Sequence, residues 1–499
     1  MKPAIPSGTR DFSPWDVAKR NYIFSVLKET FERYGYQPIE TPAMENLETL
    51  TGKYGEEGDK LIFRILNSGE FFIDFLDEYI NKKYFSNRSR PVSFKESFSN
   101  ITLDALKKYL NTYNIVLDVK LLSSELTKFV SEKALRYDLT VPFARYVVQH
   151  QHEITFPFKR YQMQPVWRAD RPQKGRYREF YQCDVDVIGS NSLLNEVELL
   201  QMVNEIFGEL LPAINFSIKI NNRKILKGFA ELIGLKDRLE ELTNILDKSE
   251  KTGVEKTVEE LREKNLAGES NIAQVKQYIE KNLTASGSNE KIKYLQELFT
   301  GSPDGVQGLQ EIDFVLKYAE NLNIPVALDM VLARGLNYYT GVICEVKPVA
   351  VTLSSSICGG GRYDDLTGIF GLPGVSGVGV SFGIERIIDV MNELNLFNKL
   401  SLTVSSSKVL FVNFGPAEEK FCLPLVSTVR SAGINAELYP DHAKIKKQFE
   451  YADKKKIPYV AIVGSEEMQS GMITLKEMKT GEQKKMTVEQ MIQELKNSL

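Results

Sequence analysis

A loop rich in cationic side chains opens the stretch of this chain that is best suited to chemistry. Its charged members between positions 168 and 178 are Arg168, Arg171, Lys174, Arg176 and Arg178. Pro172 and Gly175 supply turn residues within the same loop. Arginine and lysine side chains on a turning backbone are suited to holding phosphate groups. The composition therefore predicts an anion-binding loop.

A strand with one polar face follows this loop, at residues 181–188. β-Branched residues are frequent in it and Gly189 ends it, which predicts period-two alternation. One face then carries Gln182, Asp184 and Asp186, and the other Cys183, Val185 and Val187. An exposed edge strand would carry the same polar residues. Because a cationic loop leads directly into an anionic face, the pair is suited to holding a polyphosphate beside a cationic small molecule.

Two further runs carry residues that can bind a small molecule. In RYDLT, Asp138 and Thr140 are two apart and would share one face of an extended segment, where they offer acceptors to an ammonium group. A turn or a helix cap would use the same two residues. In RGLNYYTG, at residues 334–341, Gly335 lets the backbone approach a ligand closely. The paired tyrosines of this run are also common in cores and interfaces.

These runs together carry a resemblance to a known family. Arg168, Asp170, the loop GRYREF and the polar strand resemble motif 2 of class II aminoacyl-tRNA synthetases, and RGLNYYTG resembles the signature of histidyl-tRNA synthetases. Residues 377–394, a small-residue strand followed by an apolar helical stripe that excludes Arg386, resemble motif 3. A surface arginine on a packed helix would give the same pattern. Asn337 stands where the family usually has Asp, which affects one hydrogen bond.

The resemblance implies a site divided between ATP and L-histidine. Arg168 would hold the α-phosphate and the histidine carboxylate, since its planar fork matches both, and Arg334 would stabilise charge developing on the α-phosphate. The other ATP contacts implied are Asp170 at the adenine amino group, Phe180 at the purine face, Arg176 at the terminal phosphates and Arg386 at the γ-phosphate. The histidine contacts implied are Asp138, Thr140 and Gln182 at the α-ammonium, and Asp186, Tyr338 and Tyr339 at the imidazole. Mg²⁺ is expected with ATP, held by phosphates and water without a dedicated protein site.

Composition is consistent with a large globular protein. The 499 residues include 42% hydrophobic and 26% charged ones, which predicts two or three domains. The net charge of −3 means that nucleic acid must be met by a local basic patch. Four scattered cysteines argue against a disulfide framework or a zinc cluster, and three histidines argue against histidine-based catalysis. No signal-peptide-like or membrane-spanning run occurs, so a cytoplasmic location is expected.

The N-terminal segment predicts a helix followed by an extended segment. Ser13 is a suitable N-cap, Pro14 suits the first helical position, and Gly35 suits the C-terminal cap. The extended run YQPIETP follows, and the pair resembles motif 1 of class II synthetases. That motif implies a homodimer interface, although a helix packed on its own domain gives the same periodicity. Residues 60–66, KLIFRIL, predict a strand.

Boundaries follow from changes in composition. The expected order is a catalytic part at 1–66, an insertion of unassigned role at 67–132, a catalytic part at 133–214, a helical insertion at 215–323, a catalytic part at 324–400, a linker at 401–407 and an α/β domain at 408–499. In the last domain, alternating strands and helices predict a largely parallel sheet. Its lysines at positions 444, 446, 447, 454, 455 and 456 predict either a solvated helix face or a contact for tRNA phosphates.

The expected fold is an α+β catalytic domain, an antiparallel sheet flanked by helices, with a helical insertion and a C-terminal anticodon-binding domain. The resemblance implies a histidine-tRNA ligase whose partners are L-histidine, ATP and histidine-accepting tRNA. Two rivals come from other classes: a non-catalytic regulatory paralogue, like the subunit that controls ATP phosphoribosyltransferase, and an RNA-binding or stress-signalling module. The ATP-gripping arginines and the C-terminal domain argue against the first, and retention of the whole active-site set argues against the second. Another class II specificity is a third alternative.

Overall fold

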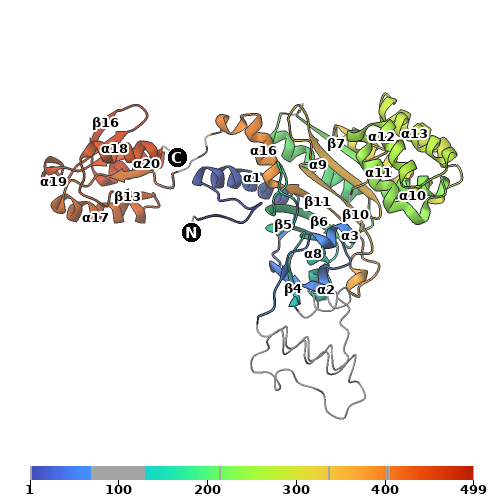
Figure 1. Ribbon diagram of the computed structural model, residues 1–499. Helices are drawn as coiled ribbons and strands as arrows, with labels where there is room; N and C mark the ends of the chain where they lie inside the picture. Colours follow the sequence, from blue (N-terminus) through green and yellow to red (C-terminus); the bar gives the residue numbers. More distant parts are fainter. Residues whose placement is uncertain are drawn as a thin grey trace, which may run out of the picture. The chain divides into compact units, whose positions relative to one another are not determined.

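The chain forms two compact units (Figure 1). The computed structural model describes residues 3–68, 130–212, 215–334, 338–400, 402 and 405–497. Unit 1 comprises Met1–Asp11 and Ile23–Leu396, and unit 2 comprises Phe12–Tyr22 and Phe397–Leu499. Most of the insertion expected at 67–132 and part of the linker expected at 401–407 fall outside the described residues.

An eight-stranded sheet forms the centre of unit 1, in the order β1-β5-β6-β11-β10-β9-β7-β8. Neighbouring strands run antiparallel except for the pairs β1–β5 and β7–β8, which are parallel. The predicted antiparallel sheet is therefore confirmed for its interior. The strands are β1 (Gln37–Pro38), β5 (Phe158–Trp167), β6 (Glu179–Ile188), β11 (Gly377–Gly383), β10 (Cys358–Tyr363), β9 (Val342–Pro348), β7 (Phe216–Asn222) and β8 (Val326–Leu328).

The strand with the polar face, β6, is an interior strand. It pairs with β5 along ten residues on one side and with β11 on the other. The alternative of an exposed edge strand is therefore wrong, because both edges of β6 carry ladder hydrogen bonds. Its polar face is buried in the molecule, and its polar side chains need partners or a ligand there.

Helices cover this sheet on the side where α9 (Leu194–Leu210) lies (Figure 1). The helix that precedes the sheet, α1 (Pro14–Arg33), begins as predicted: the Ser13 hydroxyl accepts from the Asp16 amide at 3.2 Å, and the Asp16 carboxylate accepts from the Ser13 amide at 3.1 Å. This is a reciprocal cap. Gly35, just after the helix, has a φ of 82°, which a residue with a side chain rarely adopts.

Helices α10 to α13 gather beside β7 (Figure 1), in the region where a helical insertion was predicted. The helical run begins at Arg223, since residues 216–222 form β7 of the main sheet. Gly228 and Gly305 allow α10 and α15 to approach closely: a Cβ on Gly228 would lie 2.7 Å from Gly305 Cα. The helices are α10 (Arg223–Leu232), α11 (Leu239–Thr252), α12 (Val254–Glu263), α13 (Glu269–Thr284), α14 (Ser288–Leu298) and α15 (Pro303–Asn321), with a 3-10 turn, η2 (Lys236–Arg238).

A small three-stranded sheet, in the order β2-β4-β3, lies near α8. The prediction of a strand over residues 60–66 is wrong for most of that run. Helix α3 extends to Lys60, where the Leu61 amide still donates to the Gly58 carbonyl, and only Arg64–Ile65 pair as β3. The remaining described elements of unit 1 are β2 (Met44–Asn46), α2 (Leu47–Leu50), α3 (Gly55–Lys60), β3 (Arg64–Ile65), β4 (Lys133–Leu135), α8 (Thr140–Gln149), η3 (Gly368–Phe370) and α16 (Ile384–Glu393).

Unit 2 contains a separate five-stranded sheet, in the order β13-β12-β14-β15-β16. Alternate residues of β12 (Val409–Phe411) enter different cores. Val409 and Phe411 pack with residues of α17 (Pro416–Ser431) and α20 (Val488–Asn497), and Leu410 packs with residues of α18 (Ile445–Lys454). The prediction of a largely parallel sheet is only half right, because β14–β15 and β15–β16 are antiparallel. The turn between β15 and β16 contains Gly481 with a φ of 80°.

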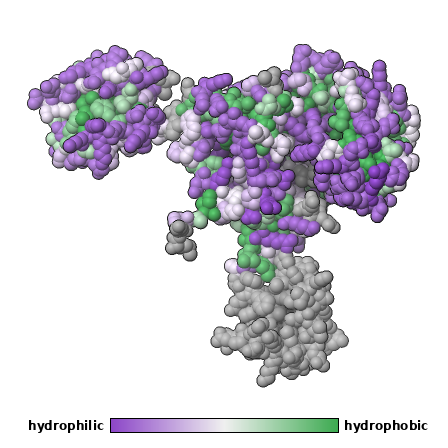
Figure 2. Space-filling model, turned by 45° about the horizontal axis from the view of Figure 1, so that its top comes forward, coloured by the Kyte–Doolittle hydropathy of each residue, from purple (hydrophilic) through white to green (hydrophobic). Residues whose placement is uncertain are grey.

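On the face shown in Figure 2, hydrophilic residues cover most of the surface of unit 2. The six lysines named above lie on or beside α18. The elements are η4 (Leu396–Lys399), β12 (Val409–Phe411), α17 (Pro416–Ser431), β13 (Ala436–Leu438), α18 (Ile445–Lys454), β14 (Tyr459–Ile462), α19 (Ser465–Ser470), β15 (Ile473–Glu477), β16 (Gln483–Met486) and α20 (Val488–Asn497). Within the described ranges, no helix of either unit is both long and apolar enough to cross a membrane.

Candidate functional site

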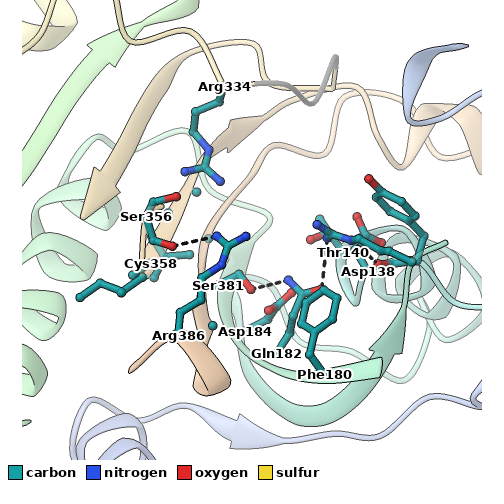
Figure 3. A pocket seen from close by; sticks show the side chains of 18 of the residues that line it. Asp138, Thr140, Phe180, Gln182, Asp184, Arg334, Ser356, Cys358, Ser381 and Arg386 are labelled. Carbon is teal, nitrogen blue, oxygen red and sulfur yellow. Dashed lines mark hydrogen bonds between the residues drawn. The ribbon is translucent and has the colours of Figure 1, made fainter. Parts of the chain in front are cut away.

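A pocket of about 300 Å³ opens over the polar face of the central sheet. Figure 3 shows Arg334 and Arg386 on one side of it, Asp138 and Thr140 on the other, and Gln182, Asp184 and Ser381 between them. Every site residue predicted from the sequence lines this pocket: Asp138, Thr140, Arg168, Asp170, Arg176, Phe180, Gln182, Asp186, Arg334, Tyr338, Tyr339 and Arg386. Residues that are up to about 250 positions apart in the chain are thus brought together.

The floor of the pocket is open because small residues face the polar residues of β6. Gly379 of β11 lies opposite Asp186, and Ser381 lies opposite Asp184. A Cβ on Gly379 would lie 1.9 Å from Asp186 Oδ1, so a larger residue there would displace the carboxylate. Gln182 donates to the Ser381 hydroxyl at 2.6 Å, which fixes the end of the floor nearest to Arg168.

Four arginines make one end of the pocket strongly cationic. Arg168 lies between two rings, 4.2 Å from the centroid of Tyr137 and 5.2 Å from that of Phe180. Arg386 donates to the carbonyls of Gly175 and Ser356, each at 2.8 Å. Burial lowers the pKa of Arg386 to about 10, and the positive charges of three other pocket arginines add to this: Arg168, Arg176 and Arg334. Such mutual repulsion indicates a site for a polyanion.

Arg334 is held in an unusual backbone conformation. Its φ of 57° lies in the left-handed region, where residues with side chains are uncommon. Its guanidinium donates to the Cys344 carbonyl at 3.3 Å and lies against Gly359, where a Cβ would come within 1.7 Å of Nη1. Gly335 and Asn337, which follow it in the RGLNYYTG run, lie outside the described residues.

Asp138 and Thr140 both line the pocket, but the prediction that they share an extended segment is wrong. Thr140 begins α8, because the Asp138 carboxylate accepts from the Val141 amide at 3.1 Å and turns the chain into the helix. The same carboxylate accepts from the Tyr54 hydroxyl at 2.9 Å and the Tyr338 hydroxyl at 3.4 Å. Burial raises the pKa of Asp138, and these hydrogen bonds oppose the rise. Asp138 is therefore both a cap and a buried acceptor in the pocket.

Asp186 has a protein group close to each of its oxygens, but only Oδ1 makes a hydrogen bond among the described residues. Oδ1 accepts from the Tyr363 hydroxyl at 2.7 Å, and Oδ2 lies 2.8 Å from Nη2 of Arg160. Neither partner was named from the sequence as a site residue. Tyr363 belongs to the glycine-rich run CGGGRYDDL, and as the aromatic residue of that run it could have been identified from the sequence. Arg160 lies in β5, where no sequence motif marks it as a site residue. The Tyr338 ring lies 4.8 Å from the Tyr339 ring and 6.3 Å from the Tyr363 ring, which makes an aromatic wall.

Little in the described chain is suited to holding a metal ion by itself. Among the described residues, no group of three or more His, Cys, Asp or Glu side chains is arranged to bind one. The four cysteines are buried and unpaired. His150 lies at the end of α8, where its Nδ1 is 3.0 Å from the Glu153 carboxylate, away from the pocket lining.

Known proteins resemble this chain along most of its length. The family described as Histidyl-tRNA synthetase matches residues 8–71 and 122–387, and the Anticodon binding domain matches residues 408–498. The histidine–tRNA ligase of Phocaeicola vulgatus is 50% identical over 497 residues, which cover 98% of each chain, and that of Christiangramia forsetii is 50% identical over 487 residues, or 97% of each chain.

Solved structures agree with the sequence relatives. The crystal structure of histidyl-tRNA synthetase from Nostoc sp. PCC 7120 matches with a TM-score of 0.73 and 27% identity, and the match covers 100% of both chains. The pocket with its four arginines thus lies within a fold, and within a stretch of sequence, that these relatives share. This chain belongs to the histidyl-tRNA synthetase family.

Proposed function

We propose that this chain is an ATP-dependent histidine-tRNA ligase. It activates L-histidine with ATP to give histidyl-adenylate and pyrophosphate, and then transfers histidine to the 3′ end of its tRNA. The observation that carries the proposal is the convergence of Arg168, Arg334 and Arg386 on a pocket that also holds the buried acceptor Asp138. A zwitterionic amino acid and a polyphosphate need such a division of charge when both leave water.

In the first step, a carboxylate oxygen of histidine attacks the α-phosphorus of ATP. The bond from that phosphorus to the bridging oxygen of the β-phosphate breaks, and pyrophosphate leaves. Arg168 holds the carboxylate and the α-phosphate, while Arg334 stabilises the charge that develops on the α-phosphate. Their rigid supports, the Tyr137 and Phe180 rings and the Cys344 carbonyl, support a role in positioning charge before the reaction.

The rest of the pocket binds the two substrates. Asp170 accepts from the adenine amino group, Phe180 covers the purine, and Arg176 and Arg386 hold the terminal phosphates. The α-ammonium of histidine is bound by Asp138, Thr140 and Gln182, and its side chain lies against Asp186, Tyr338 and Tyr339. The phosphates of ATP would carry Mg²⁺, which would neutralise part of their charge without a dedicated protein site.

In the second step, the terminal hydroxyl of tRNA attacks the carbonyl carbon of the adenylate and releases AMP. The domain at 408–499 binds the anticodon stem of histidine-accepting tRNA, and the helical insertion at 215–323 contacts the acceptor arm. The lysines on and beside α18 supply contacts to phosphates. The catalytic parts at 1–66, 133–214 and 324–400 together carry the first step. The protein acts in the cytoplasm as a homodimer built through α1 and β1, which sedimentation analysis would test.

ATP–pyrophosphate exchange with each amino acid in turn tests this function. We expect exchange with histidine alone, and a loss of about 100- to 1000-fold in Arg334→Ala. Arg262→Ala is the matched control, because this arginine is exposed on α12 and pairs with Glu269 outside the pocket. Exchange with no amino acid would reject the proposal in favour of a regulatory paralogue. Exchange with a different amino acid would assign another class II specificity.

A further inference from the structure

Residues 329–334 connect β8 to Arg334 without helix or strand, yet most of this segment is buried. Its four central residues are each no more than 4% exposed: Met330, Val331, Leu332 and Ala333. Buried backbone groups need hydrogen-bond partners, and an irregular segment must take many of them from side chains. The Arg334 side chain extends from the end of this segment into the pocket (Figure 3), so the groups that hold the segment also determine where that side chain begins.

Three buried side chains hold the first half of the segment. Asn221 of β7 donates to the Met330 carbonyl at 3.0 Å and to the Leu332 carbonyl at 2.9 Å. From α13, the Tyr278 hydroxyl donates to the Met330 carbonyl at 3.0 Å, and the Asn282 side chain accepts from the Met330 amide at 2.8 Å. The segment is therefore fixed both to the central sheet and to the helical insertion.

A single carboxylate of α11 holds the end of the segment. Oδ1 of Asp247 accepts from the Ala333 amide at 3.1 Å and from the Arg334 amide at 3.4 Å. Arg334 has a φ of 57°, and a residue with a side chain stays in this left-handed region only where its surroundings enforce it. Two successive amides directed at one charged acceptor supply such a constraint.

Asp247 can serve as a fixed point because α11 is joined to the central sheet. About one turn further along this helix, the Glu250 carboxylate lies 2.8 Å from Nζ of Lys219 in β7 and also pairs with Lys347 of β9. The guanidinium of Arg334 has fewer anchors. Nη1 donates to one backbone carbonyl of β9 at 3.3 Å, and Nε is buried without a hydrogen bond to any residue in the described ranges. The position of the guanidinium therefore depends on the backbone that Asp247 holds.

We infer that Asp247 is a positioning residue for adenylate formation, which keeps Arg334 in the left-handed conformation from which its guanidinium reaches the α-phosphate. The inference rests on the proposed function, because that function gives Arg334 its role. Helices α10 to α15 are described in full, and none of their residues lines the pocket. Asp247 therefore acts on the reaction only through Arg334.

A double-mutant cycle in the full-length protein tests this role. Asp247→Ala should lower the kcat of histidine-dependent pyrophosphate exchange by about 10- to 100-fold, since a misplacement of about 1 Å can cost about 100-fold. The KM values for ATP and histidine should change little, because Arg334 stabilises charge that develops in the transition state. In an Arg334→Ala background, the same substitution should cause no further loss, because the group that Asp247 positions is absent.

Two further variants separate positioning from a general effect on the helix. Asp247→Asn should retain more exchange than Asp247→Ala, because its side-chain oxygen can still accept from the two amides. Lys248→Ala is the matched control, since this exposed side chain is the next residue of α11, and it should leave kcat unchanged. The thermal midpoint of each variant should stay close to that of the unmodified protein, because Asp247 is itself exposed and its truncation leaves no buried cavity.

Losses that multiply in the double variant would overturn the inference, because Asp247 would then act independently of Arg334. Full exchange in Asp247→Ala would also overturn it, as would a raised KM with an unchanged kcat. If truncation lowered the thermal midpoint, the same cycle with Asp247→Asn would decide. Absence of histidine-dependent exchange in the unmodified protein would instead reject the proposed function, and the inference with it.

Discussion

Asp186 and Arg160 form an ion pair beneath the pocket, with Oδ2 2.8 Å from Nη2 and neither side chain more than 4% exposed. The Arg160 guanidinium also lies 4.1 Å from the centroid of the Phe143 ring, and its Nη1 donates to Gln162 at 3.0 Å. The protein therefore buries both side chains of the pair almost completely. Such a pair depends on both members, because removing one leaves the other as a buried uncompensated charge.

Arg160→Met and Asp186→Asn should each lower the free energy of unfolding by about 3 to 5 kcal/mol. The double variant should lose less than the sum of the two, since it leaves no unpaired charge. Urea denaturation in a Trp15→Phe background would measure this, because Trp167 of β5 then reports on unit 1 alone. Strictly additive losses would show that the two side chains do not stabilise each other.

Arg386→Gln should separate stability from binding. The pKa of Arg386 is lowered to about 10 by burial and by the neighbouring arginines, so its positive charge destabilises the folded state at every pH below that value. Replacing it with a neutral residue should raise the thermal midpoint of the protein without ATP. The same change should raise the KM for ATP and reduce the stabilisation that ATP gives. Thermal unfolding with and without ATP would check both effects, and a lower midpoint without ATP would contradict the argument.

Several features of the pocket could be predicted from short sequence patterns. The alternation of residues 181–188 predicted which side chains share a face, and the structure confirms that face, because side-chain direction in a strand depends on the strand alone. The cationic loop was predicted by residue type, and the RGLNYYTG run by its resemblance to a family signature. Each of these signals lies within about ten residues of sequence.

The partners of those residues were not predictable in this way. Arg160 meets Asp186 because β5 and β6 pair in one register, and Tyr363 meets it from β10, two strands away from β6. Register is a property of the assembled sheet. The start of α8 at Thr140 was missed for a similar reason: the capping by Asp138 involves its own helix, but Tyr54 and Tyr338 hold the carboxylate from other parts of the chain.

Charge reversal on α18 tests the contact with tRNA. Lys446 and Lys447 are exposed near the start of this helix, and no resolved ion pair of the described residues engages them. Lys446→Glu with Lys447→Glu should weaken tRNA binding and reduce its dependence on salt concentration, because fewer counterions are released from the phosphates. Histidine-dependent pyrophosphate exchange should not change. Lys399→Glu in η4 is the control, because this exposed lysine lies outside α18, and equal loss of tRNA binding in both proteins would argue against a local contact.

Substitution by alanine should affect activity at one of two neighbouring glycines of β10 and stability at the other. A Cβ on Gly359 would lie 1.7 Å from Nη1 of Arg334, the end of a side chain that can move away. A Cβ on Gly360 would lie 1.9 Å from the Gly379 carbonyl oxygen and 2.6 Å from Val380 Cα, which are backbone atoms of the adjacent strand.

Gly359→Ala should therefore keep the fold and displace the Arg334 guanidinium. Pyrophosphate exchange would fall by about 100-fold or more, as for loss of a charge-stabilising donor, with little change in the thermal midpoint. Gly360→Ala should lower the thermal midpoint, because the sheet must separate where β10 meets β11, and any loss of activity would follow from unfolding. Circular dichroism melts and exchange rates measured on both proteins distinguish the cases. If Gly359→Ala retained full exchange, the position of Arg334 against β10 would not matter for adenylate formation.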